Sequence, residues 1–301
     1  MFNKLVVACL PLIPRPVIRR ISSRYIAGDT LDDAIATVRR LHDEEGARGT
    51  IDVLGEFVED RGMALASRSA SSDVLTGIAG NGLRGVTGLS IKPTSLGLGL
   101  DEDFALENVR QLATQARDAG LFMRIDMENT PYTDATLRLY RRLREDGFDN
   151  VGIVLQAMLH RTEQDLRDHL EYRPSVRLCK GIYKEPRHLA WTGREEIRHS
   201  YKRLLRLIME HGLYCGIATH DDPLIDDALE VVAAHGLGHG DYEFQMLLGV
   251  RENVRRRLLA DGHKLRVYVP FGEDWYGYST RRLKENPEMA GMIAKAVLLG
   301  R

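Results

Sequence analysis

The stretch V-G-I-V-L-Q, residues 151–156, is a short run of apolar and β-branched side chains that ends on a polar glutamine. A run of this length is typical of a strand that is buried on both faces, as strands of parallel sheets are. Amphipathic helical stretches lie on either side of it. The pattern therefore predicts a strand within a series of βα units.

The same alternation repeats from Thr50 to the end of the chain. Eight apolar runs can be counted, and each but the last is followed by a helical segment. The runs are Thr50–Leu54, Gly88–Lys92, Leu121–Asp126, Val151–Gln156, Ser175–Lys180, Tyr214–His220, Tyr242–Met246 and Leu265–Pro270. Eight strands is the number that closes a (β/α)8 barrel, so we predict an α/β fold of the TIM-barrel type.

Length and composition set the number of domains. The chain has 301 residues, of which 44% are hydrophobic, and this suffices for one large barrel or two ordinary domains. No Pro, Gly or Ser linker is long enough to separate domains. We therefore expect an N-terminal helical arm, residues 1–48 with a helix over 31–45, followed by a single catalytic barrel, residues 49–301.

Charge and cysteine content limit the classes of partner and compartment. Lys and Arg total 42 and Asp and Glu total 43, so a net charge of -1 gives no reason to expect nucleic acid as a partner. Cys9, Cys179 and Cys215 lack C-x-x-C spacing, which favours reduced thiols and a cytoplasmic location.

The N-terminal stretch 5–13 is apolar but too short to span a bilayer, and Pro11 and Pro14 break it. It is neither a transmembrane helix nor a good signal peptide. Because basic residues follow it at 15, 19 and 20, two alternatives stay open: peripheral contact with the inner face of the cell membrane, or packing on the barrel.

Gly80, Gly82 and Gly85 match the G-x-G-x-x-G pattern of dinucleotide-binding folds. That pattern must follow a strand and open a helix, whereas these glycines precede a predicted strand. We therefore interpret them as a loop.

Polar residues end many of the predicted strands. In a barrel the active site is built from the carboxyl ends of the strands, so a ring of such residues indicates a site there. The ring consists of Lys92, Asp126, Gln156, Arg177, Lys180, His220, Glu243 and Gln245.

A second set follows the last strand: Tyr278, Arg281, Arg282 and Glu285 share one face of a predicted helix. Two adjacent guanidinium groups near an aromatic ring suit a carboxylate ligand. The run 255–257, also rich in arginine, has no such context, and we expect it to be an exposed, ion-paired helix.

Metal and hydrolase chemistry find little support. His220 and Asp221 have no second histidine at a ligand spacing, and the surrounding cations would repel a metal ion, so we expect none. Neither Ser90 nor Ser95 lies in a G-x-S-x-G turn.

Taken together, the motifs resemble those of the monofunctional bacterial proline dehydrogenases, from the N-terminal arm to the last barrel helix. The segments that carry the resemblance are S-I-K at 90–92, R-I-D-M-E at 124–128, V-L-Q-A at 154–157, R-L-C-K-G-I-Y-K-E at 177–185, A-T-H-D at 218–221, Y-E-F-Q-M-L at 242–247, V-Y-V-P-F-G at 267–272 and Y-S-T-R-R-L-K-E at 278–285.

The resemblance implies roles for individual residues. It implies that Asp126 and Arg177 are catalytic, with Arg177 near the flavin N5 and Asp126 paired with the positive cluster. It implies a substrate site formed by Lys92, Tyr268, Tyr278, Arg281 and Arg282. It implies FAD contacts from Met127, Gln156, Arg177, Lys180, Gly181, Ile182, Thr219 and His220.

The activity implied is oxidation of L-proline to Δ1-pyrroline-5-carboxylate, the first step of proline catabolism, with hydride transfer to FAD. The family passes its electrons to a membrane quinone, and a pyrroline-5-carboxylate dehydrogenase is a partner to consider for the product.

Two alternatives compete with this interpretation. One is a barrel aldolase that uses Lys92 or Lys180 as a Schiff-base nucleophile, which requires a lysine of lowered pKa. The other is a barrel that binds an amino acid without catalysis.

Overall fold

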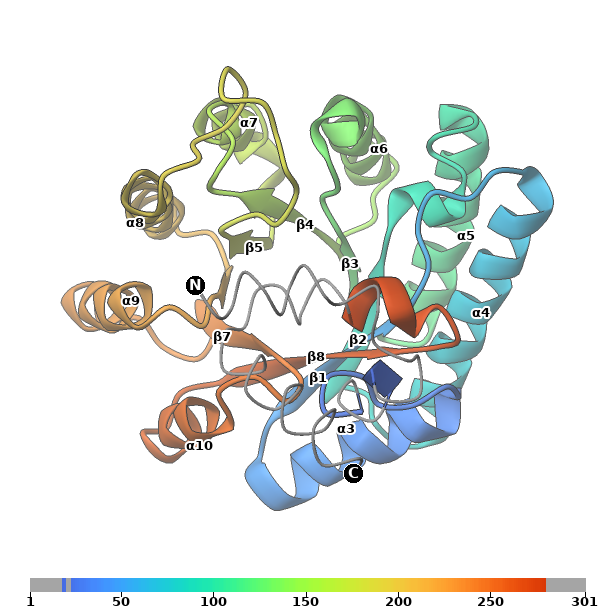
Figure 1. Ribbon diagram of the computed structural model, residues 1–301, viewed down its shortest axis with the longest axis horizontal. Helices are drawn as coiled ribbons and strands as arrows, with labels where there is room; N and C mark the ends of the chain where they lie inside the picture. Colours follow the sequence, from blue (N-terminus) through green and yellow to red (C-terminus); the bar gives the residue numbers. More distant parts are fainter. Residues whose placement is uncertain (1–17, 20–22, 280–301) are drawn as a thin grey trace.

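The computed structural model describes residues 18–19 and 23–279, and their centre is a closed barrel of eight parallel strands in sequence order. The strands are β1 (Arg48–Val53), β2 (Thr87–Ile91), β3 (Met123–Ile125), β4 (Val151–Gln156), β5 (Val176–Cys179), β6 (Cys215–Ala218), β7 (Tyr242–Leu247) and β8 (Leu265–Phe271). β1 pairs with both β2 and β8, which closes the barrel. The predicted (β/α)8 fold is confirmed (Figure 1).

Strand β3 is shorter than predicted because the helix before it extends its cap into the expected strand. Gly120 has a φ of 67°, and the N–H of Leu121 donates to the carbonyl of Ala116 at 2.7 Å. Leu121 therefore belongs to the helix end, a glycine-dependent left-handed cap.

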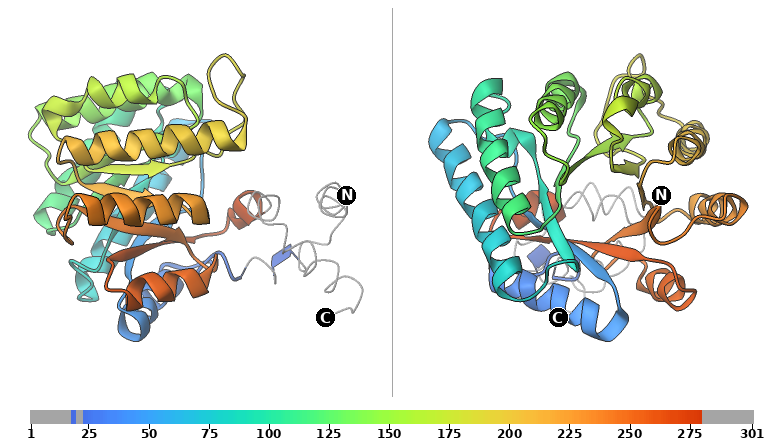
Figure 2. Two further views of the ribbon diagram at one scale, coloured as in Figure 1. Left: turned by 90° about the vertical axis from the view of Figure 1, so that its left-hand side faces the viewer. Right: turned by 180° about the vertical axis from the view of Figure 1, so that it is seen from behind.

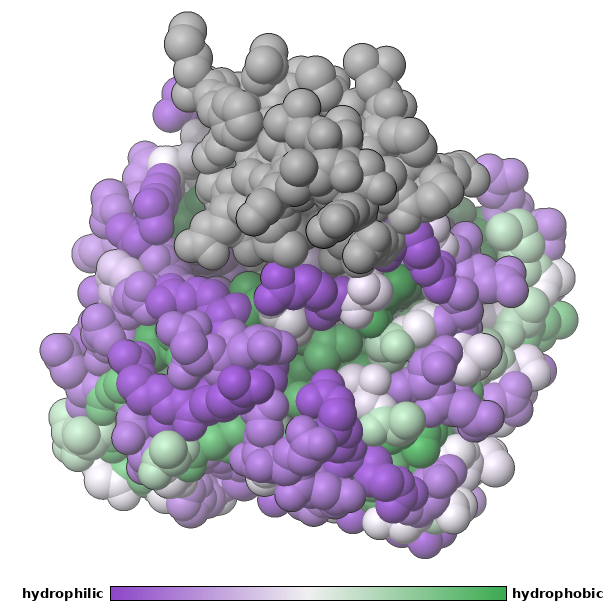
Figure 3. Space-filling view, turned by 60° about the horizontal axis from the view of Figure 1, so that its bottom comes forward, coloured by the Kyte–Doolittle hydropathy of each residue, from purple (hydrophilic) through white to green (hydrophobic). Residues whose placement is uncertain are grey.

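Helices surround the barrel (Figure 1). They are α3 (Leu31–Glu45), α4 (Arg61–Gly80), α5 (Glu102–Asp118), α6 (Thr133–Glu145), α7 (Thr162–Arg167), α8 (Arg194–Glu210), α9 (Asp222–Ala234) and α10 (Glu252–Ala260), with short 3-10 turns at Pro93–Leu96, Thr130–Tyr132 and Leu170–Tyr172. The helices turn polar sides outward, and hydrophilic side chains predominate among the coloured residues in Figure 3, with apolar patches between them.

Helix α3 lies where the predicted arm helix was expected, over residues 31–45. A capping box between Thr30 and Asp33 begins it, and Gly46 ends it in a left-handed conformation. Its buried residues, among them Val38 and Leu41, join the main core, and the helix packs against β1 and β8. It thus covers the seam of the barrel, the line along which β1 pairs with β8. The domain boundary after residue 48 stays a prediction.

The chain after β8 takes a different course from the helices around the barrel. Residues 275–279 are helical and lie beyond the carboxyl end of β8, coloured red in Figure 2. They therefore approach the end of the barrel where an active site is expected.

Gly82 and Gly85 lie in the loop before β2, as predicted, whereas Gly80 is the last residue of helix α4. The loop leads into β2 instead of opening a helix.

None of the helices among residues 18–19 and 23–279 is long and apolar enough to cross a membrane. The apolar N-terminal stretch and Cys9 lie outside the described residues. Cys179 is half-buried and Cys215 is buried, and both are free thiols.

The expectation of an exposed arginine run at 255–257 is wrong for Arg255. Its side chain is 1% exposed, and its Nε and Nη2 each donate to the carboxylate of Glu45 at 2.8 Å. Glu45 is the last residue of α3, so this buried ion pair joins the helix that covers the seam to α10.

Replacing Arg255 by alanine is expected to lower the free energy of unfolding by about 3–5 kcal/mol, because the carboxylate of Glu45 would remain buried without its partner. Arg256→Ala is the control: Arg256 also faces Glu45, at 3.7 Å, but its side chain is 63% exposed. Loss of the Arg256 side chain should lower the free energy of unfolding by only about 0–1 kcal/mol. Urea denaturation of both variants measures the difference.

The Arg255→Ala effect should depend on pH. Burial alone would raise the pKa of Glu45, but the hydrogen bond and charge of Arg255 outweigh burial and lower it. The stabilisation is therefore fully present above the ordinary pKa of a glutamate and is lost as the pH falls through the lowered pKa of Glu45. Equal losses in the two variants at neutral pH would contradict this role.

Candidate functional site

A cavity of about 1550 Å³ opens at the carboxyl end of the barrel. It exceeds the range of about 300–1,000 Å³ that is usual for drug-sized ligands, so it has room for a large cofactor together with a small substrate. The predicted site residues that the structure describes all line it: Lys92, Asp126, Met127, Gln156, Arg177, Lys180, Gly181, Ile182, Thr219, His220, Tyr268 and Tyr278. Arg281 and Arg282 lie outside the described residues.

Lys92 is held by a carboxylate that the sequence analysis did not identify. Its Nζ donates to the two oxygens of Asp52 at 2.7 and 2.6 Å, and Asp52 is 1% exposed. Burial disfavours the charged ammonium form of Lys92. The negative charges of Asp52 and Asp126 outweigh burial and raise the pKa of Lys92. Lys92 is therefore a fixed cation at the bottom of the cavity.

Asp126 forms the second ion pair of the site. Nη1 of Arg177 and the hydroxyl of Ser90 each donate to its Oδ1 at 2.7 Å. The resemblance implied that Asp126 pairs with the positive cluster of Lys92, Arg281 and Arg282. Among the residues that the structure describes, its ion-pair partner is Arg177, and its charge also acts on Lys92; Arg281 and Arg282 lie outside these residues.

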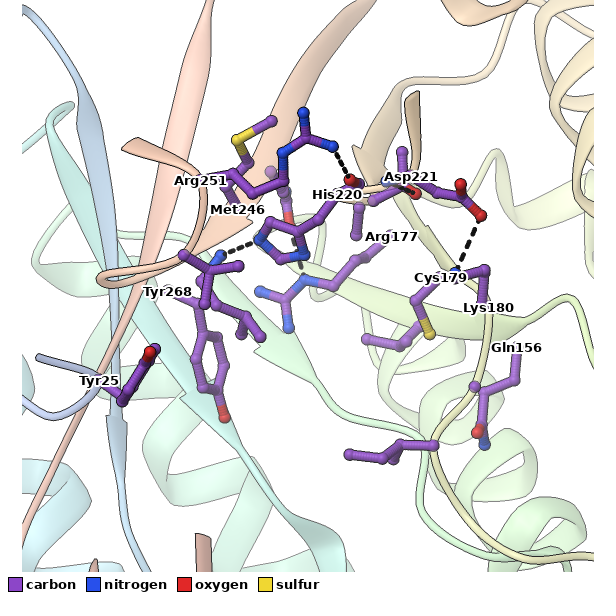
Figure 4. A pocket seen from close by; sticks show the side chains of 18 of the residues that line it. Tyr25, Gln156, Arg177, Cys179, Lys180, His220, Asp221, Met246, Arg251 and Tyr268 are labelled. Carbon is purple, nitrogen blue, oxygen red and sulfur yellow. Dashed lines mark hydrogen bonds and ion pairs between the residues drawn. The ribbon is translucent and has the colours of Figure 1, made fainter. Parts of the chain in front are cut away.

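Tyr268 connects the two ion pairs. Nζ of Lys92 donates to its hydroxyl at 3.3 Å, and that hydroxyl donates to Oδ2 of Asp126 at 3.4 Å. Burial raises the pKa of Tyr268 well above its ordinary value, so the phenol remains a donor. The guanidinium of Arg177 lies 5.5 Å from the centre of the same ring (Figure 4).

Gln156, at the end of β4, lines the cavity and carries a buried hydrogen-bond acceptor. Its Nε2 donates to the backbone carbonyl of Glu128 at 2.8 Å. Its Oε1 is buried and has no partner among the described residues. A buried acceptor without a partner costs free energy, so it indicates a ligand that supplies a donor.

A cluster of cations surrounds Asp221 on the other side of the cavity. Lys180 donates to its Oδ2 at 3.1 Å, Arg198 contacts both oxygens, and Arg194 lies 3.5 Å from Oδ1. Burial would raise the pKa of Asp221, but the bonds from Arg198 and Lys180 hold it well below its usual range. Arg198 also pairs with Glu195, so these three cations contact two carboxylates, and the excess of positive charge suits an anionic ligand.

His220 has a fixed tautomer. The backbone N–H of Leu247 donates to its Nε2 at 2.9 Å, so this nitrogen carries no proton and the ring is neutral with its proton on Nδ1 (Figure 4). Arg251 donates to the His220 carbonyl at 3.0 Å and holds the loop after β6.

Glu243 is the one member of the predicted ring that does not line the cavity. It is 1% exposed, and its carboxylate is paired with Arg266 at 2.6 Å inside the barrel. The reason is its place on β7: it lies two residues before Gln245 on the same inward face, and therefore deeper in the barrel.

Sequence reasoning missed Asp52, Asp221 as the centre of a cation cluster, and Tyr25. Asp52 lies in the first predicted strand. A charged residue among apolar neighbours could have marked it as a candidate site residue. Tyr25 lines the cavity and packs in a small apolar cluster with Tyr278. No local pattern in the sequence marks it.

Among the described residues, no group of His, Cys, Asp and Glu side chains could hold a metal ion. The described residues of the site offer fixed charges, hydrogen bonds and a large cavity.

Comparison with known proteins identifies the family of the chain. A family model described as proline dehydrogenase matches residues 34–295. The proline dehydrogenase of Deinococcus radiodurans is 36% identical over 285 residues, which are 93% of this chain and 91% of that protein. Proline dehydrogenase 1 of Bacillus subtilis is 36% identical over 275 residues, covering 91% and 90% of the two chains.

The fold is also similar to that of a solved structure, proline utilization A from Bdellovibrio bacteriovorus, inactivated by N-propargylglycine. The TM-score is 0.83 at 21% identity, and the match covers 89% of this chain. It spans 33% of that chain. From the family match along most of its length, the chain belongs to the proline dehydrogenase family of oxidoreductases.

Proposed function

We propose that this protein oxidises L-proline to Δ1-pyrroline-5-carboxylate with bound FAD as the electron acceptor and a quinone as the final acceptor. The observation that carries the proposal is the pairing of two buried ion pairs, Lys92 with Asp52 and Arg177 with Asp126, at the bottom of one large cavity. Membership of the proline dehydrogenase family supports the choice of substrate.

The residues around the cavity fit FAD. Oε1 of Gln156 is a buried acceptor suited to a ring N–H, and the cations around Asp221 suit a diphosphate. We propose that Met127, Gln156, Arg177, Lys180, Gly181, Ile182, Thr219 and His220 hold the cofactor. When bound, FAD supplies the acceptor for the hydride that leaves the proline ring carbon.

The substrate carboxylate needs a fixed cation, and Lys92 is one. We propose that Lys92, together with Arg281 and Arg282, binds the carboxylate, and that Tyr268 and Tyr278 line the ring pocket. Oxidation to the imine removes a hydride from the ring carbon and a proton from nitrogen. The protein's contribution is to orient the ring and exclude water.

The aldolase alternative is disfavoured by the charge state of the lysines. A Schiff-base lysine needs a lowered pKa, whereas the pKa of Lys92 is raised by Asp52 and Asp126. Lys92 is therefore not prepared to act as a neutral nucleophile. Lys180 is paired with the carboxylate of Asp221.

The purified protein is expected to be yellow, and L-proline added without oxygen should bleach the flavin absorbance. This experiment also separates catalysis from mere amino-acid binding. Colourless protein that FAD cannot reconstitute, or flavin that proline leaves oxidised, would overturn the proposal. Reoxidation of the bleached enzyme by a soluble quinone analogue tests the final acceptor.

Two further associations follow from the family resemblance. We propose peripheral contact with the membrane that carries the quinone, and delivery of the product to a pyrroline-5-carboxylate dehydrogenase. Sedimentation with anionic vesicles tests the first.

A further inference from the structure

Glu243 and Gln245 lie two positions apart on β7 and point into the barrel beneath the site. Nε2 of Gln245 donates to Oε1 of Glu243 at 2.7 Å, and Oε1 of Gln245 accepts from Nε of Arg177 at 2.6 Å. Both residues are buried. A chain of hydrogen bonds therefore runs from the interior of the barrel to the guanidinium of the site.

The amide of Gln245 has only one favourable orientation. Turned over, its NH₂ would face the guanidinium N–H of Arg177, and its oxygen would face the carboxylate of Glu243. Arg266 fixes that carboxylate in turn, with bonds of 2.6 and 3.1 Å to its two oxygens. The carboxylate of Glu243 thus makes the amide of Gln245 point its oxygen toward Arg177. Arg177 gains an acceptor in this way without a second negative charge beside its guanidinium.

Gly216 on β6 provides the space for this amide. A Cβ atom built at Gly216 would lie 2.4 Å from Nε2 and 2.8 Å from Cδ of Gln245. Any side chain at this position would displace the amide, so the strand next to β7 is shaped around it.

The result is a guanidinium held on two sides. Gln245 accepts from Nε, and Asp126 and Ser90 accept from Nη1 at 2.7 and 3.2 Å. Among residues 18–19 and 23–279, none accepts from Nη2, and Arg177 lines the cavity (Figure 4). The direction of the remaining N–H groups is therefore set by the residues that hold the other two nitrogens.

We infer that Gln245, oriented by Glu243 and seated over Gly216, is a positioning residue that aims Arg177 at the reacting atoms. The inference rests on the proposed function, since it concerns the same cavity. It adds a residue that lines the same cavity and whose role is to act through Arg177.

The test is Gln245→Met, which keeps the side-chain volume and removes both hydrogen bonds. The rate constant for flavin reduction by proline, measured by anaerobic stopped flow per bound flavin, should fall at least about tenfold. The Michaelis constant for proline should stay within about threefold, because Lys92 and Asp52 are untouched. Gln111→Met is the matched control: Gln111 also donates to a glutamate, Glu107, at 2.9 Å, but on the exposed face of α5.

Glu243→Gln is the second variant and keeps nearly the same shape. A neutral amide at 243 can donate or accept, so the amide of Gln245 is no longer restricted to one orientation, and the reduction rate should fall at least about threefold. If Gln245→Met does not fold, the reduction rate of Glu243→Gln tests the positioning role.

The outcomes distinguish a failure of the proposed function from a failure of the positioning role. Wild-type flavin that proline does not reduce overturns the proposed function. Wild-type flavin that is reduced, with Gln245→Met or Glu243→Gln reduced at the same rate per bound flavin, overturns the positioning role alone. Lower thermal stability or flavin content together with an unchanged reduction rate also overturns the positioning role, because a purely structural role predicts that outcome.

Discussion

Asp126→Asn is expected to lower the rate of flavin reduction by proline at least about 100-fold, which corresponds to about 2.7 kcal/mol of activation free energy. The substitution keeps the shape of the side chain but removes the charge that Arg177 contacts at 2.7 Å. Both side chains are largely buried, at 9% and 14% exposure, so water would not replace the lost interaction. The barrel should remain folded and should still bind flavin.

The control for Asp126→Asn is Asp146→Asn. Asp146 also accepts from an arginine, Arg110, at 2.7 Å, but on the surface, where the two side chains are 33% and 40% exposed. Surface pairs of this kind contribute about 0–1 kcal/mol, and this one lies far from the cavity, so activity should not change. If Asp126→Asn reduced its flavin at the parental rate, Asp126 would be a bystander at a strand end.

Asp52→Asn is expected to lower the free energy of unfolding by about 3–5 kcal/mol and to weaken proline binding, because the buried ammonium of Lys92 would lose its counter-charge. Asp52 is 1% exposed and receives two short bonds from Lys92, at 2.6 and 2.7 Å. Without them, Lys92 can turn toward Asp126 and leave the position that we propose for binding the substrate carboxylate.

Two measurements test Asp52→Asn: urea denaturation and proline-dependent flavin reduction. Asp103→Asn is the matched control, since Asp103 pairs with Arg142 at 3.0 Å on the surface and is 85% exposed. A double variant with Lys92→Met should recover part of the stability but not the activity, because it removes the unpaired charge together with the cation. Parental stability and proline dependence in Asp52→Asn would refute this assignment.

The features that the sequence predicted well are local. The eight strands and the helix at residues 31–45 follow from runs and periodicities within a few residues of one another. The polar strand ends, such as Lys92 and Gln156, could be grouped because parallel strands in a closed barrel bring their carboxyl ends together. Once the barrel is known, a shared cavity follows for most of them.

Which side chains pair with which was decided only by the tertiary structure. Arg255 and Glu45 are 210 positions apart, and nothing in the run 255–257 distinguishes the buried arginine from its exposed neighbours. Glu243 and Gln245 both sit on one strand, yet one is buried with Arg266 and the other reaches Arg177. The sequence by itself determined the strand order, the helix faces and the chemical character of the site, because these depend on short-range patterns. The partners of each charge depend on depth in the barrel and on side chains facing across it, and those distances exist only when the chain is folded.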